Sequence, residues 1–89
     1  MRFVWDEKKA RANFRKHRVS FEEAQTVFKD DDARILGDFG HSDDEDRFNI
    51  IGRSTSLRYL FVCHCYRRED VIRIISARKA SSAEMRLYF

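Results

Sequence analysis

The sequence predicts a single domain of the α+β class, in which helices cover one face of an antiparallel sheet. The chain has 89 residues, the size of one small domain, so we treat residues 1–89 as a unit. Apolar residues recur at helical spacing in its first third, and runs typical of strands follow from residue 33 onward. The connections between these runs are short, and short connections favour antiparallel neighbours.

The chain is expected to begin with a short strand followed by a basic helix. Residues 3–5 are apolar and predict an edge strand. Asp6 can cap a helix that extends to about His17, because its carboxylate can accept an N–H of the first turn. Ala10 and Phe14 are four residues apart, so they share one face of this helix and can turn toward the core.

The other two helices are expected to begin at the same motif, S-x-x-E. Ser20 and Glu23 predict a capping box for a helix over residues 21–29. Ser81 and Glu84 predict a second box for a short C-terminal helix. In such a box the serine accepts an N–H of the first turn, and the glutamate accepts the N–H of the serine. We therefore assign structural roles to these four residues.

Four further strands are expected to form an antiparallel meander. A polar loop is predicted over residues 39–46, between the first two of them. The predicted order is β-α-α-β-β-β-β-α, in two layers. The expected strands cover residues 33–38, 47–53, 57–66 and 71–78.

Charge is distributed unevenly along the chain. The net charge is +3, but residues 1–46 hold nine basic and twelve acidic side chains, whereas residues 47–89 hold nine and three. A basic helix and a basic second half indicate a polyanionic partner, nucleic acid before a membrane; a solvated charged surface is the alternative. We expect a cytoplasmic protein without membrane association, since the sequence has neither a signal-peptide pattern nor the ~20 apolar residues of a membrane span.

The sequence Cys63-His64-Cys65 raises the question of a metal site. In a regular strand both cysteines lie on one face and the histidine on the other, so the three cannot converge on one ion. A structural zinc site would also require a second pair of cysteines, which the chain lacks. The acidic run at residues 43–46 is interpreted as a solvated loop. We therefore predict no metal and no cofactor.

The segment at residues 73–80, RIISARKA, concentrates groups that bind phosphate. Guanidinium is a planar clamp that stays charged near neutral pH, which favours Arg73 and Arg78 for this role. In a regular strand, however, residues five apart point to opposite faces. A β-bulge, or a strand that ends before Arg78, would remove this difficulty. The alternative is an ordinary sheet edge with solvent-exposed arginines.

His17 is a candidate for proton transfer, because imidazole titrates near neutral pH. It is expected at the C-terminal end of the basic helix, where the helix dipole favours its cation. The alternative is therefore a helix-end group without catalytic function.

Several segments together resemble the BrnT family of type II toxins over the whole chain. The order and spacing of two of them, WDxxKxxxNxxKH and RIISAR, make the resemblance specific. In one departure, Arg18 stands where family members often have glycine between the helices. The matching residues are Trp5-Asp6, Lys9, Asn13, Lys16-His17, 19–24, Asp38, Arg47, 51–53, 73–80, Glu84 and Tyr88.

The resemblance implies a RelE-like fold and growth-arresting RNA cleavage without a metal. It also implies a partner antitoxin, BrnA, that forms a hetero-oligomer with the toxin and represses their shared operon on operator DNA. A non-catalytic nucleic-acid-binding module is the alternative, and a protein-interaction subunit is a third class.

In such a reaction the RNA 2′-hydroxyl attacks the adjacent phosphate, which requires cations, a base and an acid. We predict phosphate stabilisation by Arg73 and Arg78, with Arg47 third, and acid–base roles for Lys16 and His17. Glu84 competes for the base role, although its position in a capping box favours structure. Further RNA contacts are expected from Ser76 on a phosphate oxygen, Tyr88 on a base, and Lys9 and Lys79.

Overall fold

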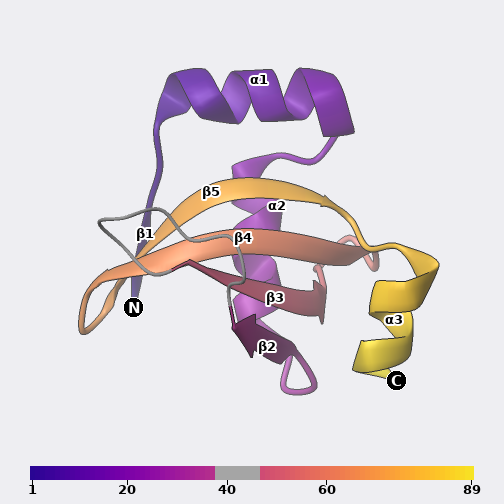
Figure 1. Cartoon of the computed structure of the whole chain (residues 1–89). Helices are drawn as coiled ribbons and strands as arrows, with labels where there is room; N and C mark the ends of the chain where they lie inside the picture. Colours follow the sequence, from indigo (N-terminus) through magenta and orange to yellow (C-terminus); the bar gives the residue numbers. More distant parts are fainter. Residues whose placement is uncertain (38–46) are drawn as a thin grey trace.

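The computed structural model describes residues 1–37 and 47–89 (Figure 1). The predicted loop over residues 39–46, with its acidic run, lies outside these residues, as does Asp38. The elements are β1 (Arg2–Val4), α1 (Glu7–His17), α2 (Phe21–Gln25), the 3-10 helix η1 (Thr26–Lys29), β2 (Arg34–Gly37), β3 (Phe48–Arg53), β4 (Tyr59–Arg68), β5 (Val71–Lys79) and α3 (Ser82–Tyr88).

The α+β class is confirmed, but the sheet is mixed rather than antiparallel. Its five strands lie in the order β1-β5-β4-β3-β2, with β1 at one edge. Strands β2 to β5 pair antiparallel with their sequence neighbours, whereas β1 pairs parallel to the start of β5. Turn lengths predict pairing only between consecutive strands. The partner of β1 lies at the other end of the chain, and local signals do not reveal it.

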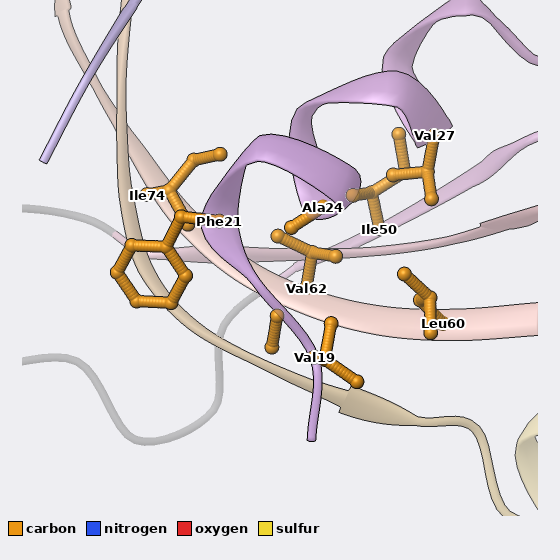
Figure 2. Close-up of a cluster of buried hydrophobic side chains, with 9 residues drawn as sticks. Val19, Phe21, Ala24, Val27, Ile50, Leu60, Val62 and Ile74 are labelled. Carbon is orange, nitrogen blue, oxygen red and sulfur yellow. The ribbon is translucent and has the colours of Figure 1, made fainter. Parts of the chain in front are cut away.

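The core lies between α2–η1 and the central strands (Figure 2). Phe21, Ala24 and Val27 are spaced by three, so they share one face of the helical segment and are fully buried. Gly52 of β3 allows η1 to approach closely, because a Cβ there would lie 3.1 Å from Val27. The buried partners from the α1–α2 connection and the sheet are Val19, Ile50, Leu60, Val62, Ile74 and Ala77.

The second helix is shorter than the predicted span of residues 21–29. It ends at Gln25, and η1 continues it as a tighter helix. The Glu23 carbonyl accepts both the Thr26 hydroxyl, over 2.7 Å, and the Thr26 N–H, and the second of these is the i to i+3 bond of a 3-10 turn.

Helix α1 ends at a left-handed residue. Arg18 has φ 59° and ψ 31°, and its N–H donates to the Phe14 carbonyl over 2.8 Å. Glycine adopts this conformation without a Cβ penalty, which accounts physically for a glycine at this place in the family pattern.

Helix α3 does not join α1 and α2 in one layer, so the prediction of helices on one face is wrong for this helix. It lies beside the end of the sheet (Figure 1), where Tyr88 and Phe89 pack their rings on Tyr59. Tyr59 pairs with Arg53, and both belong to the strand register that faces away from α2. Only a two-residue connection follows β5, so α3 is held close to that strand's end.

Among the described residues, no helix has the length and apolar character needed to cross a membrane.

Candidate active site

A β-bulge interrupts the pairing of β4 with β5 at its centre. The ladder is regular up to the pair Cys63–Ser76, and the next pair is His64–Ile74. Ile75 is therefore an extra residue on β5, and a bulge of this kind shifts the facing of every residue beyond it.

The bulge brings Arg73, Ser76 and Arg78 to the same face of the sheet. Arg78 lies opposite Phe61 and Ser76 opposite Cys63, two residues apart on β4, and Arg73 lies opposite Cys65 after the shift. Cross-strand partners share a face. We call this surface the second face, because the core of Figure 2 occupies the other one. The geometric difficulty that regular alternation predicts for Arg73 and Arg78 is thereby removed.

The guanidinium of Arg78 is held in a defined position. Its two terminal nitrogens donate to the two carboxylate oxygens of Glu84 over 2.9 and 2.8 Å. Its carbon lies 4.4 Å from the centre of the Phe61 ring, within the range of a cation–π contact. One terminal nitrogen also donates to the Lys79 carbonyl over 3.2 Å. Among the described residues, no hydrogen-bond acceptor is found for the Nε hydrogen and one Nη2 hydrogen of Arg78, so both can bind a ligand.

Glu84 has a structural role, as predicted from its capping box. Ser81 accepts the N–H of Glu84 over 3.1 Å, and Glu84 accepts the N–H of Ser81 over 2.8 Å. The hydrogen bonds from Arg78, opposed by partial burial and aided by Ser81, hold the pKa of Glu84 below its ordinary value. A carboxylate with a lowered pKa and both oxygens bound is a poor general base.

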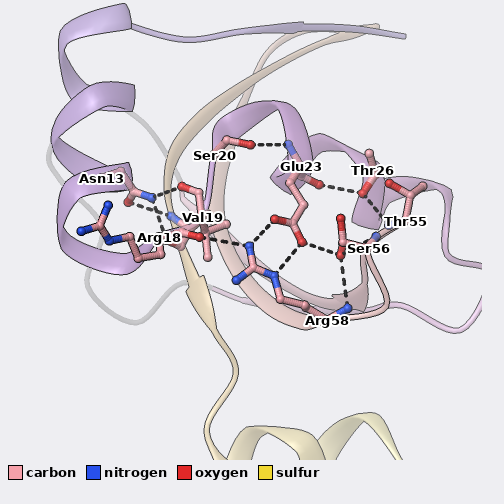
Figure 3. A network of polar contacts seen from close by, with 11 residues as sticks. Asn13, Arg18, Val19, Ser20, Glu23, Thr26, Thr55, Ser56 and Arg58 are labelled. Atoms are coloured by element: carbon pink, nitrogen blue, oxygen red, sulfur yellow. Dashed lines mark hydrogen bonds and ion pairs between the residues drawn. The ribbon is translucent and has the colours of Figure 1, made fainter.

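Asn13 ties α1 to the strand that carries these groups. Strand β1 pairs with β5 only as far as Arg73, and no other strand of the described residues covers the edge beyond it. The Asn13 amide takes the place of a strand there: it donates to the Ala77 carbonyl over 2.8 Å and accepts the Ala77 N–H over 3.1 Å. It also donates to the Val19 carbonyl over 3.0 Å (Figure 3). Ala77 lies between Ser76 and Arg78, so this buried amide fixes the position of both.

The contact through Asn13 also determines which side of α1 each basic residue occupies. Phe14 lines a groove with α2, and α2 lies on the core face. Successive helical residues are about 100° apart, which places Lys9 and Lys16 on the opposite side of Asn13 from Phe14. These two exposed lysines therefore lie on the side of α1 that turns toward the second face. His17 is half-buried and lies on the Phe14 side, so α1 does not present Lys16 and His17 together.

Two other predicted residues lie differently. Lys79 pairs with the buried Leu60, so it belongs to the register opposite to that of Arg78 and is not brought to the same surface. Arg47 directly precedes β3 and is half-buried. Its Nε is buried, with no hydrogen-bond partner among the described residues.

Tyr88 docks α3 on the acidic turn before β2. Its hydroxyl donates to Asp30 over 2.7 Å, which raises the pKa of Tyr88 to about 12. Burial pushes the pKa of Asp30 upward, but hydrogen bonds from Arg53 N–H, Tyr88 and Asp32 N–H outweigh it and hold that pKa low. The ring of Tyr88 lies edge-on to Tyr59, with centroids 5.3 Å apart. The tyrosine predicted to stack on a base thus has a docking role in this fold.

The first capping box is only half formed. Ser20 accepts the N–H of Glu23 over 3.0 Å, as predicted. The carboxylate of Glu23 does not return to Ser20, however, but pairs with Arg58 and accepts the Ser54 hydroxyl over 2.7 Å (Figure 3). The prediction for Glu23 is wrong in this respect, because an arginine from β4's entry supplies a charged partner.

His64 is part of the core. It is fully buried and lies against the rings of Phe28, Phe48 and Tyr66. Burial, only partly offset by the Val62 carbonyl, lowers its pKa and so favours the neutral ring. Within residues 1–37 and 47–89, no three His, Cys, Asp or Glu side chains are grouped to hold a metal ion.

Sequence reasoning missed several functional neighbours of this face. Asn13 stood out only as one position of the family pattern, and neither its burial nor its contact with β5 was predicted. Arg2, Arg67 and Arg68 line a cleft with Arg73, which depends on the parallel pairing of β1. That non-local pairing carries no signal in a single sequence.

Comparison with known proteins identifies the family and a similar fold. The family model described as "Ribonuclease toxin, BrnT, of type II toxin-antitoxin system" matches residues 5–84. Among solved structures, the chain is similar to the Brucella abortus ribonuclease toxin BrnT, at 26% identity and a TM-score of 0.68. That match covers 92% of this chain and 99% of the Brucella chain. No curated protein matches the chain in sequence. The chain belongs to the BrnT family of ribonuclease toxins of type II toxin–antitoxin systems.

Proposed function

We propose that this chain is a cytoplasmic endoribonuclease toxin with a RelE-like fold, which cleaves RNA on the second face of its sheet and thereby arrests translation and growth. The observation that carries the proposal is the bulge at Ile75, which sets Arg73, Ser76 and Arg78 on one face. Family membership supplies the reaction class, and the face supplies groups suited to it.

The reaction needs no cofactor in this proposal. The 2′-hydroxyl of the substrate attacks the adjacent phosphorus, the P–O5′ bond breaks, and a 2′,3′-cyclic phosphate and a 5′-hydroxyl result. Negative charge grows on the phosphorane oxygens, and Arg73 and Arg78 are placed to neutralise it. Ser76 is exposed between them and can donate to a phosphate oxygen.

Proton transfer is assigned to α1. Lys16 is the stronger candidate, because its side of the helix turns toward the second face. His17 is the weaker one, since it lies half-buried on the other side of Asn13. Arg47 is the third candidate for phosphate stabilisation, and Lys9 is assigned to further RNA contacts.

The reaction is tested with the purified chain, a labelled RNA and analysis of product ends. We expect cleavage that persists in EDTA and leaves 2′,3′-cyclic phosphate or 3′-phosphate ends. Loss of cleavage in EDTA with recovery on a divalent ion would contradict the metal-free mechanism. Salt-dependent RNA binding without cleavage would instead support a non-catalytic binding module.

The partner is proposed to be a BrnA-like antitoxin that binds operator DNA as a complex with this chain. An acidic segment of the antitoxin would cover the basic second face, and charge complementarity would speed its association. A 1:1 mixture should therefore cut RNA far more slowly than the free toxin. Cleavage at the rate of the free toxin would rule out this mode of neutralisation.

A further inference from the structure

A second group of basic side chains lies at the other end of β5 from Arg78. At that end the turn between β4 and β5 lies beside β1 (Figure 1). A cleft of about 350 Å³ opens there, lined by the arginine side chains and by Trp5 and Asp6. We call it the arginine cleft, after Arg2, Arg67, Arg68 and Arg73.

The strand register accounts for this grouping. Val71 of β5 has Arg2 opposite it on β1 and Arg68 opposite it on β4. Cross-strand partners share a face, and neighbouring strands are about 5 Å apart, so both arginines flank one valine. Arg73 follows two residues along β5, on the same face. Arg67 is the extra residue at a second register shift, next to Arg68.

Four like charges in one small cleft repel one another unless an anion joins them. The only carboxylate that lines the cleft, within the described part of the chain, is Asp6. Asp6 caps α1, and the hydrogen bond from Lys9 N–H is the main reason that its pKa is lowered despite some opposing burial. The ion pairs that the described residues form, Glu23 with Arg58 and Glu84 with Arg78, lie elsewhere. Among the residues that line the cleft, four arginines thus face one carboxylate, an excess that favours an external anion, and guanidinium suits phosphate.

Trp5 indicates what the phosphate is attached to. Its indole N–H donates to Glu7 over 2.6 Å, and Phe21 lies edge-on to its ring with centroids 6.0 Å apart. The ring also packs against the core, so it is held in one orientation, and Trp5 lines the wall of the cationic cleft. A fixed aromatic beside arginines is the arrangement that binds single-stranded nucleic acid through stacking and backbone contacts.

We propose that the arginine cleft anchors a backbone phosphate of single-stranded RNA next to the scissile one, with Trp5 stacking on the attached base. The cleft shares Arg73 with the proposed active site and is continuous with it along β5. The inference rests on the proposed function, since it places the substrate strand of that reaction. It assigns Arg2, Arg67 and Arg68 to substrate binding rather than to bond cleavage.

The test compares two double variants that remove the same charge. R67Q/R68Q changes the cleft at exposed positions in the β4–β5 turn region, and R11Q/R15Q changes the outer side of α1. Binding is measured on a 2′-deoxy oligonucleotide, which the proposed reaction cannot cleave, at several salt concentrations. We expect R67Q/R68Q to weaken binding about tenfold and to reduce the slope of log K against log salt by up to about 0.7, the value for one phosphate contact on a single strand. The slope for R11Q/R15Q should stay at the wild-type value.

Two further measurements make the assignment specific. The chain has one tryptophan, so quenching of its fluorescence reports directly on the cleft. The oligonucleotide should quench Trp5 in the wild type, and an abasic oligonucleotide or inorganic phosphate should quench it far less. In RNA cleavage, R67Q/R68Q should raise KM about tenfold and leave kcat near the wild-type value.

Several outcomes would overturn the proposal. If R67Q/R68Q and R11Q/R15Q lost equal affinity for the oligonucleotide, binding would depend on overall charge and not on the arginine cleft. Normal RNA binding by R67Q/R68Q together with loss of antitoxin binding would make the cleft an antitoxin contact. If the oligonucleotide did not quench Trp5 fluorescence, the proposed stacking of a base on Trp5 would be wrong. A wild type that binds the oligonucleotide through the cleft but cleaves no RNA would leave the anchoring site standing and refute the proposed catalysis instead.

Discussion

The two S-x-x-E motifs of this chain begin alike and end differently. In both, the serine accepts the N–H three residues later, Ser20 at α2 and Ser81 at α3. Glu84 accepts the N–H of its capping serine, Ser81, and also binds Arg78. Glu23 instead binds Arg58 and the Ser54 hydroxyl, so its capping box is not completed. The motif therefore determines the capping serine, and a nearby arginine decides what the glutamate binds.

The two glutamate–arginine pairs are expected to serve different purposes, stability for Glu23–Arg58 and activity for Glu84–Arg78. The pair Glu23–Arg58 joins α2 to the start of β4, and Arg58 further donates to the Arg18 carbonyl over 3.1 Å (Figure 3). The glutamate side chains are 12% exposed at Glu23 and 18% at Glu84, and the arginine side chains are 31% exposed at Arg58 and 41% at Arg78. The first pair thus connects the helical layer to the sheet, and the second holds a guanidinium on the face proposed for catalysis.

The largest expected effect on folding is from Glu23→Ala. It leaves Arg58 and Ser54 without their acceptor, and breaking one partner of a buried pair costs about 3–5 kcal/mol. Because this pair is partly exposed, we expect a loss of about 2–3 kcal/mol in the free energy of unfolding. Denaturant unfolding measures this loss, and cleavage per folded molecule should be unchanged. A variant as stable as the wild type would show that the network in Figure 3 contributes little.

Arg78→Ala should affect activity most. We expect cleavage to fall about 100-fold, the scale lost with one transition-state donor. Stability should fall by only about 1 kcal/mol, since the ion pair is solvent-screened. Arg78→Lys should restore little, because an ammonium cannot make the bidentate contact. Single-turnover cleavage and thermal unfolding measure both effects.

Glu84→Ala is the matched control for Arg78→Ala. It loses a cap worth about 0.5–2 kcal/mol and also the carboxylate that holds the Arg78 guanidinium, so its cleavage per folded molecule should fall, but far less than in Arg78→Ala, which lacks the guanidinium itself. A folded but inactive Glu84→Ala would make Glu84 the general base, and cleavage by Arg78→Ala at the wild-type rate would refute the phosphate role of Arg78.

Acid should weaken both pairs together. Arg58 and Arg78 hold the pKa values of Glu23 and Glu84 below the ordinary value of 4.5. A carboxyl group whose folded pKa is lowered contributes stability above its unfolded pKa and loses it as pH falls through the folded pKa. Stability should therefore decline below about pH 4.5, and the decline should be shallower in Glu23→Gln and in Glu84→Gln. Unfolding midpoints between pH 3 and 7 measure it, and a slope unchanged in both variants would contradict the assignment.

The smallest effect is expected at the joint between the two helices. Arg18→Gly relieves a left-handed conformation that costs about 1–2 kcal/mol, less the 0.5–1 kcal/mol that glycine loses in chain entropy. We expect a gain of about 0.5–1 kcal/mol in unfolding free energy, with the hydrogen bond from Arg58 to the residue-18 carbonyl retained. A destabilised variant would show that the Arg18 side chain, which lies over the Phe14 ring at 5.8 Å, matters more than its backbone strain.

The sequence by itself determined the α+β class, both ends of α1, the start of α3, both capping serines and the candidate arginines of β5. Each of these depends on neighbours within a few residues: a cap three positions away, an apolar repeat of three or four, a short turn. The family pattern added the reaction class through the same contiguous residues.

Only the tertiary structure decided which of those residues meet. The parallel pairing of β1 with β5 depends on two strands at opposite ends of the chain, and the bulge at Ile75 depends on how β4 pairs with β5. Neither leaves a local pattern, because side-chain facing follows the partner strand's register rather than the strand's own sequence. For that reason the sequence contained Arg73 and Arg78, but only the register placed them on one face.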